Sequence, residues 1–114
     1  MRTLREALAI VNEHDEGQPE AELSRLMGEL LLKQNESNGA EAQSSFERAI
    51  QIAWEQGAKS WELRATTSLA RLLKKQGRRD EARAMLADIY NWFTEGFDTA
   101  DLKNAYALLE ELKE

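Results

Sequence analysis

Basic residues in this sequence concentrate between positions 64 and 83. That segment holds seven Lys or Arg residues and two acidic ones, whereas the rest of the chain holds eight basic and 19 acidic residues. Part of the segment shares the polar face of one predicted helix and is called the basic strip: Arg64, Thr67, Ser68, Arg71, Lys74 and Lys75. Guanidinium and ammonium groups form charge-assisted hydrogen bonds with carboxylates, so the strip predicts an acidic partner. The alternative is a solvated helix end, where cations suit the helix dipole.

Residues suited to catalysis or cofactor binding are scarce. The stretch Gly57-Ala58-Lys59-Ser60 is similar to the end of a phosphate-binding loop, but it lacks the Gly directly before Lys and the preceding strand. There is no cysteine, and His14 is the only histidine, so a histidine metal cluster and a Cys nucleophile are excluded. His14 lies in an acidic run near a predicted helix end and is interpreted as a solvated side chain. The sequence therefore predicts a protein that is not an enzyme, with no cofactor and no metal.

The overall composition predicts one all-α domain. The 114 residues are 42% hydrophobic and 32% charged, include one proline, and are rich in helix-favouring types. No apolar run approaches the roughly 20 residues that span a bilayer, and the N-terminal residues lack the apolar centre of a signal peptide. We therefore expect a cytoplasmic protein without membrane contact. A formal net charge of −6 disfavours nucleic acid as a partner.

Start and stop signals divide the chain into six predicted helices. They cover residues 3–14, 19–35, 39–57, 60–76, 79–95 and 98–113. Pro19 suits the first turn of the second helix, and Gly57 and Gly77 suit left-handed C-terminal caps. Ser60 is the predicted N-cap of the fourth helix. Because the connections are short, neighbouring helices are expected to form antiparallel hairpins.

Half of the eight aromatic residues lie around Gly96: Tyr90, Trp92, Phe93 and Phe97. We expect Gly96 to be the left-handed residue just past the fifth helix, so that Phe97 contacts Trp92 one turn back. Asp98 or Thr99 then caps the last helix. This arrangement predicts that the aromatic cluster closes the fold; an exposed aromatic binding site is the alternative.

The chain also contains an internal repeat with a period of about 40 residues. Small and large residues alternate in one order at Met27, Gly28, Leu31, Ala42, Phe46 and Ala49, and again at Leu69, Ala70, Leu73, Ala82, Leu86 and Ile89. The second copy is less strict, because Ile89 stands where a small residue is usual. The small residues at 28 and 70 predict a close approach of two helices. The pattern resembles the tetratricopeptide repeat family. The resemblance implies a short right-handed superhelix of antiparallel helix hairpins with a C-terminal capping helix.

A narrower resemblance rests on the segments EAELSRLMGELLL, EQGAKSWELRATTSLARLL, QGRRDEARAML and IYNWFTEGFDTADLKNAYALLEEL. They are similar to the C-terminal repeats of bacterial signalling proteins that have a P-loop ATPase core and carry an adenylate cyclase or a helix-turn-helix output domain. The resemblance implies a single helical-repeat domain over 1–114. Its parts are a leading helix (1–17), two repeats (18–58 and 59–95) and a capping helix (96–114).

In the resembled repeats, the first helix of each hairpin lines a concave groove. The resemblance therefore places Arg25, Glu29 and Lys33 of the second helix beside the basic strip. The function that it implies is a non-catalytic scaffold for a protein or peptide, in the regulatory tail of a signalling protein. The alternative is homo-oligomerisation through an exposed first helix, motivated by its apolar residues Leu4, Leu8 and Val11. A hydrophobic core is predicted at Leu23, Met27, Leu30, Leu31, Phe46, Ile50, Leu63, Leu69, Leu73, Leu86, Ile89, Phe93, Leu102 and Leu109.

Overall fold

The structure, a computed structural model, describes residues 20–96 and 99–113. This part of the chain is all-helical, without strands, as predicted. Its elements are α2 (Glu20–Gln34), the 3₁₀ helix η1 (Glu36–Asn38), α3 (Gly39–Gln56), α4 (Lys59–Lys75), α5 (Arg79–Tyr90) and α6 (Ala100–Leu112). The predicted leading helix at 3–14 lies outside the described residues, as do Pro19, Phe97 and Asp98.

The helix ends show which local signals the chain uses. Gly57 and Gly77 are left-handed, with φ of 67° and 79°, as their capping role requires. After α4, the Arg78 N–H donates to the Leu73 carbonyl at 2.8 Å, which closes the helix end. The prediction for Ser60 was wrong. Because α4 already begins at Lys59, Ser60 falls in its first turn, and the N-cap is Ala58 without a side-chain hydrogen bond.

The predicted end of the fifth helix was also wrong. α5 stops at Tyr90 rather than near residue 95, and the Phe93 N–H then donates to the Tyr90 carbonyl at 3.1 Å in a turn. Gly96 is left-handed, with φ of 79°, but it lies in the segment before α6 and not at the end of α5. Thr99 caps α6 as predicted, since its Oγ1 accepts a hydrogen bond from the Leu102 N–H.

The aromatic residues near Gly96 divide between the core and the surface. Tyr90 and Phe93 pack against the core, which agrees with a structural role. Trp92 is exposed, although it meets Phe93 edge to face with ring centroids 5.1 Å apart. The cluster therefore closes the fold only in part.

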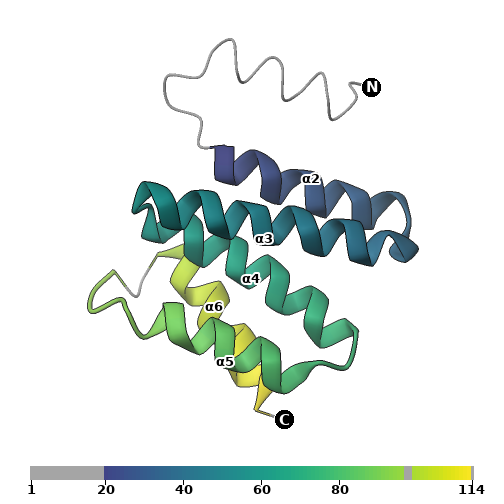
Figure 1. Cartoon of the computed structure of the whole chain (residues 1–114). Coiled ribbons are helices and arrows are strands. Elements are labelled where there is room, and N and C mark those ends of the chain that lie inside the picture. The colour runs from purple at the N-terminus through teal and green to yellow at the C-terminus, as the bar shows by residue number, and fades with distance from the viewer. Residues whose placement is uncertain (1–19, 97–98, 114) are drawn as a thin grey trace.

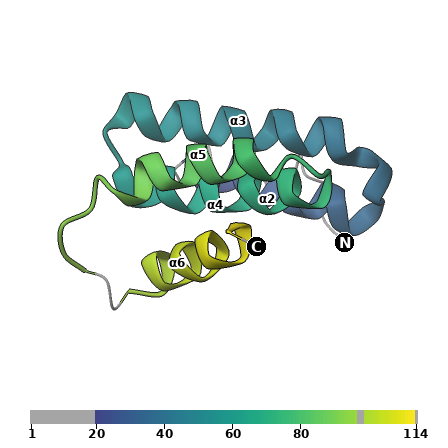
Figure 2. The same cartoon turned by 90° about the horizontal axis from the view of Figure 1, so that it is seen from below.

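Helix α4 lies at the centre of the molecule. It contacts α2, α3, α5 and α6, and Figure 2 shows it between α3 on one side and α6 on the other. Helix α6 returns to pack against both α4 and α5 (Figure 1). This central position explains why α4 buries nearly its whole middle section, from Ala65 to Ala70.

Helices α2 and α3 pack closely at Gly28. A Cβ atom on Gly28 would come within 2.5 Å of Cε1 of Phe46, whose side chain is fully buried. Gly28 therefore lets the two helices approach, as the repeat pattern predicted, and Ala70 is likewise fully buried on α4. Half of the predicted core positions are buried: Phe46, Leu63, Leu69, Leu73, Leu86, Ile89 and Leu102.

The other predicted core positions are only partly buried: Leu23, Met27, Leu30, Leu31, Ile50, Phe93 and Leu109. On α6 the prediction missed Leu108 and Leu112, which are buried. On α2 the side away from α3 carries Leu26, which is 47% exposed. The elements that the structure describes between residues 20 and 113 cover Leu26 only in part, so α2 presents an apolar side chain on its outer side.

Candidate binding groove

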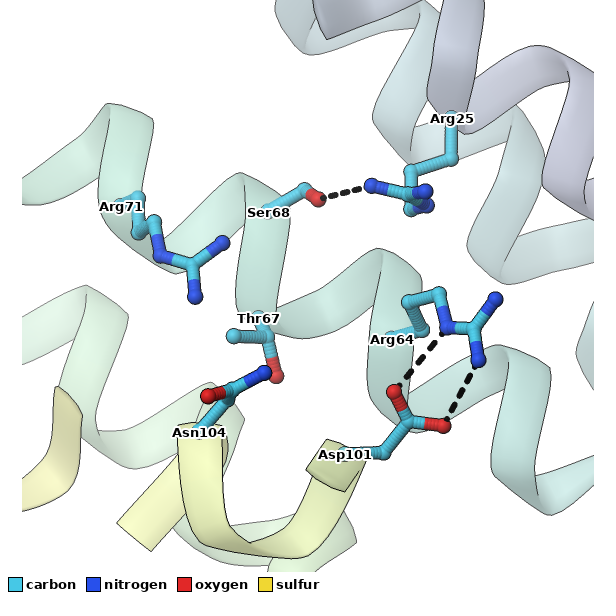
Figure 3. Close-up of a pocket in the computed structure, with 7 residues that line it drawn as sticks. All are labelled: Arg25, Arg64, Thr67, Ser68, Arg71, Asp101 and Asn104. Carbon is cyan, nitrogen blue, oxygen red and sulfur yellow. Dashed lines mark hydrogen bonds and ion pairs between the residues drawn. The ribbon is translucent and has the colours of Figure 1, made fainter. Parts of the chain in front are cut away.

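A polar groove lies where α2, α4 and α6 meet. Figure 3 shows the seven residues that line it: Arg25, Arg64, Thr67, Ser68, Arg71, Asp101 and Asn104. Its volume is about 210 Å³. Five of these residues belong to the set predicted from the sequence, so the structure brings Arg25 of α2 together with the first half of the basic strip.

Helical spacing explains how α4 forms the floor of this groove. Arg64, Thr67, Ser68 and Arg71 are three or four residues apart and therefore share one side of α4. Thr67 and Ser68 are buried, because small hydroxyl side chains fit where α4 passes close to its neighbours. The Thr67 hydroxyl donates to the Leu63 carbonyl at 2.8 Å, so its oxygen keeps acceptor capacity only. The floor is thus polar but tightly packed.

Arg64 is occupied by acidic residues on two other helices. Its Nε and Nη2 atoms donate to the two carboxylate oxygens of Asp101 at 3.0 and 3.1 Å (Figure 3), and its Nη1 donates to Glu22 at 3.2 Å. The hydrogen bond with Asp101 raises the pKa of Arg64, with smaller contributions from Glu22 and against the effect of burial. The guanidinium also lies 4.7 Å from the ring centroid of Trp61. Arg64 therefore links α2, α4 and α6 and has little capacity left for a ligand.

Arg25 is partly occupied in the same way. Its Nε donates to Glu22 at 3.0 Å and its Nη1 to the Ser68 hydroxyl at 3.4 Å. Glu29 lies at the edge, 3.9 Å from Arg25 Nη1. Glu22 thus accepts hydrogen bonds from both Arg25 and Arg64, and together with Asp101 it balances the charges of the two arginines.

Arg71 differs from the other two arginines. Within the described residues it forms no hydrogen bond and no ion pair, and it is exposed. Figure 3 shows its guanidinium directed into the space that Thr67 and Asn104 also face. The groove therefore offers one uncompensated guanidinium beside an amide.

The remaining predicted residues lie outside the groove. Lys74 forms an ion pair with Glu111 of α6 at 3.6 Å, and Lys33 is exposed in the last turn of α2. Lys75 lines a different depression, with Leu32 and Leu72. The basic strip is therefore divided along α4 rather than continuous.

Asp101 and Asn104 were missed by the sequence reasoning. They lie in the first turns of α6, and the predicted groove included residues of the second and fourth predicted helices only. The prediction treated α6 only as a cap. Asp101 matters most, because it compensates Arg64 and so leaves Arg71 as the one arginine of the groove without a partner among the described residues.

The described residues give little support for a metal site or a membrane-spanning helix. Among the residues that the structure describes, no three His, Asp or Glu side chains gather as a metal site would require. None of the helices in the described ranges combines the length and the apolarity needed to cross a bilayer.

Comparison with known proteins identifies no relative. No protein-family model, curated protein or solved structure matches the chain.

Proposed function

We propose that this chain is a non-catalytic scaffold that binds an acidic protein or peptide segment in the polar groove. The observation that carries the proposal is the exposed Arg71, which has no partner within the described residues and is directed into a groove lined by hydroxyl and amide groups. A carboxylate fits this chemistry, because a guanidinium can hold both of its oxygens. Asn104 supplies a further donor.

The repeat pattern and the arrangement of the helices support a wider proposal. The groove is built from α2, α4 and α6, alternate helices of the chain, as expected for first helices of tetratricopeptide-like hairpins in a right-handed superhelix. We propose this architecture, with α6 in the capping position, and a role as the regulatory tail of a bacterial signalling protein. No catalytic step is proposed for the chain, and its binding would take place in the cytoplasm.

The groove also sets the expected strength of binding. Three arginines line or enter it, while Glu22 and Asp101 neutralise Arg25 and Arg64. Exposed ion pairs contribute little each, typically below about 1 kcal/mol. We therefore expect modest affinity, with Arg71 as the residue on which an acidic segment depends most.

A matched pair of variants tests this function. The probe is a short fluorescein-labelled peptide rich in Asp and Glu, and its binding is measured by fluorescence anisotropy. Arg71→Glu should weaken binding about tenfold or more, because it replaces attraction by repulsion. Lys75→Glu makes the same change of charge on the same helix but outside the groove, and should leave binding within about twofold. Equal losses in both variants would show that only net charge matters and would contradict the proposal.

Homo-oligomerisation is a second candidate, favoured by the outer side of α2. Leu26 is 47% exposed there, and Leu23 and Met27 line a neighbouring depression with Ile52 of α3. Leu4, Leu8 and Val11, which first suggested assembly, lie outside the described residues. Sedimentation across a wide concentration range separates the candidates: a monomer throughout excludes assembly, whereas a dimer lost on Leu26→Glu supports it.

A further inference from the structure

A second hollow, called the tryptophan hollow, lies between α3, α4 and α5, and has a volume of about 350 Å³. The residues that carry the argument are Ile50, Trp54, Lys59, Met85, Asp88 and Trp92. Helix α4 contributes Lys59, Glu62 and Thr66 to the hollow. At 3.6 residues per turn, these lie roughly 160° around the helix from the α4 residues that form the polar groove. The two sites are therefore on nearly opposite sides of α4.

Trp54 and Trp92 are unusually exposed for their size. Their exposed fractions are 62% and 58%, and both line the same hollow. Trp61, by contrast, is half-buried beneath the guanidinium of Arg64. Partly buried Ile50 and Met85 supply apolar surface to the hollow. Exposed Trp and Met side chains around a depression are typical of the centre of protein interfaces.

The charges in the hollow indicate what kind of partner fits it. Lys59 Nζ lies 5.6 Å from the ring centroid of Trp92 and 3.1 Å from a carboxylate oxygen of Glu62, so the hollow already holds one cation between an aromatic face and a carboxylate. Asp88 is exposed and, among the described residues, forms neither an ion pair nor a hydrogen bond. With Lys59 balanced by Glu62, the hollow keeps one uncompensated negative charge.

We propose that the tryptophan hollow docks a protein segment carrying an Arg or Lys side chain next to an apolar one. The cationic group lies against the ring of Trp54, since Lys59 already lies over Trp92, and it pairs with Asp88. The apolar side chain covers Ile50 and Met85. Aromatic rings attract guanidinium and ammonium groups, and the uncompensated carboxylate selects against acidic segments. The hollow thus prefers a partner of the opposite charge from the polar groove.

Selection from a random peptide library tests this site with the intact chain. Peptides are selected on the wild-type protein and depleted on the Trp54→Ala/Trp92→Ala variant, which should fold because both side chains are mostly exposed. Far-ultraviolet circular dichroism checks the fold. We expect enriched peptides to combine Arg or Lys with an apolar residue, and to lose affinity about tenfold or more in the double variant.

Two single variants make the outcome specific. Asp88→Lys should weaken the selected basic peptides about three- to tenfold, and Arg71→Glu in the other groove should leave them within about twofold. Selection that yields no peptide dependent on the tryptophans, or peptides that are acidic and respond to Arg71→Glu, overturns the proposal. Arg71→Glu tests the polar groove and Trp54→Ala/Trp92→Ala tests the tryptophan hollow, so either proposal can be contradicted without the other.

Discussion

The ring of Phe46 on α3 fills the space in which a side chain at Gly28 of α2 would lie. A methyl group at position 28 would overlap the Phe46 ring, with Cε1 at 2.5 Å and Cδ1 at 2.8 Å. Gly28→Ala should therefore destabilise the fold by about 1–3 kcal/mol, although alanine favours helices in general. Denaturant unfolding of Gly28→Ala, Phe46→Leu and the double variant measures the overlap. The double variant should be more stable than the sum of the single changes predicts; strict additivity would contradict the contact.

Phe46 should be among the residues most sensitive to truncation. It is fully buried among fully buried alanines of α3, so Phe46→Ala leaves a cavity and should cost about 3–5 kcal/mol. Trp54→Ala on the same helix is the control, because Trp54 is 62% exposed and should change stability by less than about 1 kcal/mol. A loss below about 1 kcal/mol for Phe46→Ala would contradict the core described here.

The Arg64–Asp101 contact should contribute to the docking of α6. The Arg64 side chain is 37% exposed and that of Asp101 25%, so solvent screens the pair, and Asp101→Asn should cost about 1 kcal/mol or less. Hydrogen exchange should nevertheless rise in α6 more than in α2 or α3, because the lost contact lies at the first turn of α6. Glu110→Gln removes the exposed partner of Lys113 and is the control, expected to leave exchange unchanged. Equal effects of the two variants would contradict a special role for Asp101.

Salt should distinguish the two proposed sites. Binding of an acidic peptide in the polar groove depends on exposed charge and should weaken several-fold between low and physiological ionic strength, where the Debye length falls to about 8 Å. Binding in the tryptophan hollow rests more on apolar and aromatic contact, and should change by less than about twofold. Fluorescence anisotropy at several salt concentrations, with one acidic and one selected basic peptide, provides the measurement. Identical salt dependence would contradict the assignment of different chemistry to the two sites.

The sequence predicted the helices well where a local signal marks their ends. Gly57 and Gly77 end two helices because only glycine adopts their positive φ easily. The end of α5 has no such glycine. Helix α5 ends where the chain turns at Asn91, and this turn lets Phe93 reach the core. The packing of Phe93 therefore overrides the helical sequence pattern, which continues through residue 95. Leu108 was missed for a related reason, since the choice between Leu108 and Leu109 depends on how α6 rotates against α4 and α5.

The sequence predicted part of the lining of the groove, on α2 and α4, but neither the residues from α6 nor the balance of charge. The spacing of Arg64, Thr67, Ser68 and Arg71 is a local property of one helix, and it correctly places them on one side. Whether each cation is free depends on carboxylates far away in sequence. Asp101 is 37 positions from Arg64, and nothing in a helical pattern shows that the two meet.

The position of Asp101 makes the electrostatic character of the groove a property of how the C-terminal helix is docked. With α6 in place, Arg64 has both oxygens of Asp101 and one of Glu22 as partners. Withdrawal of α6 would remove the Asp101 carboxylate and the Asn104 amide together, and would leave a wider, more basic trough between α2 and α4. The same surface would then attract anions more strongly and discriminate among them less. The selectivity that we propose for an acidic segment therefore depends on a counter-ion that the chain itself carries, on α6.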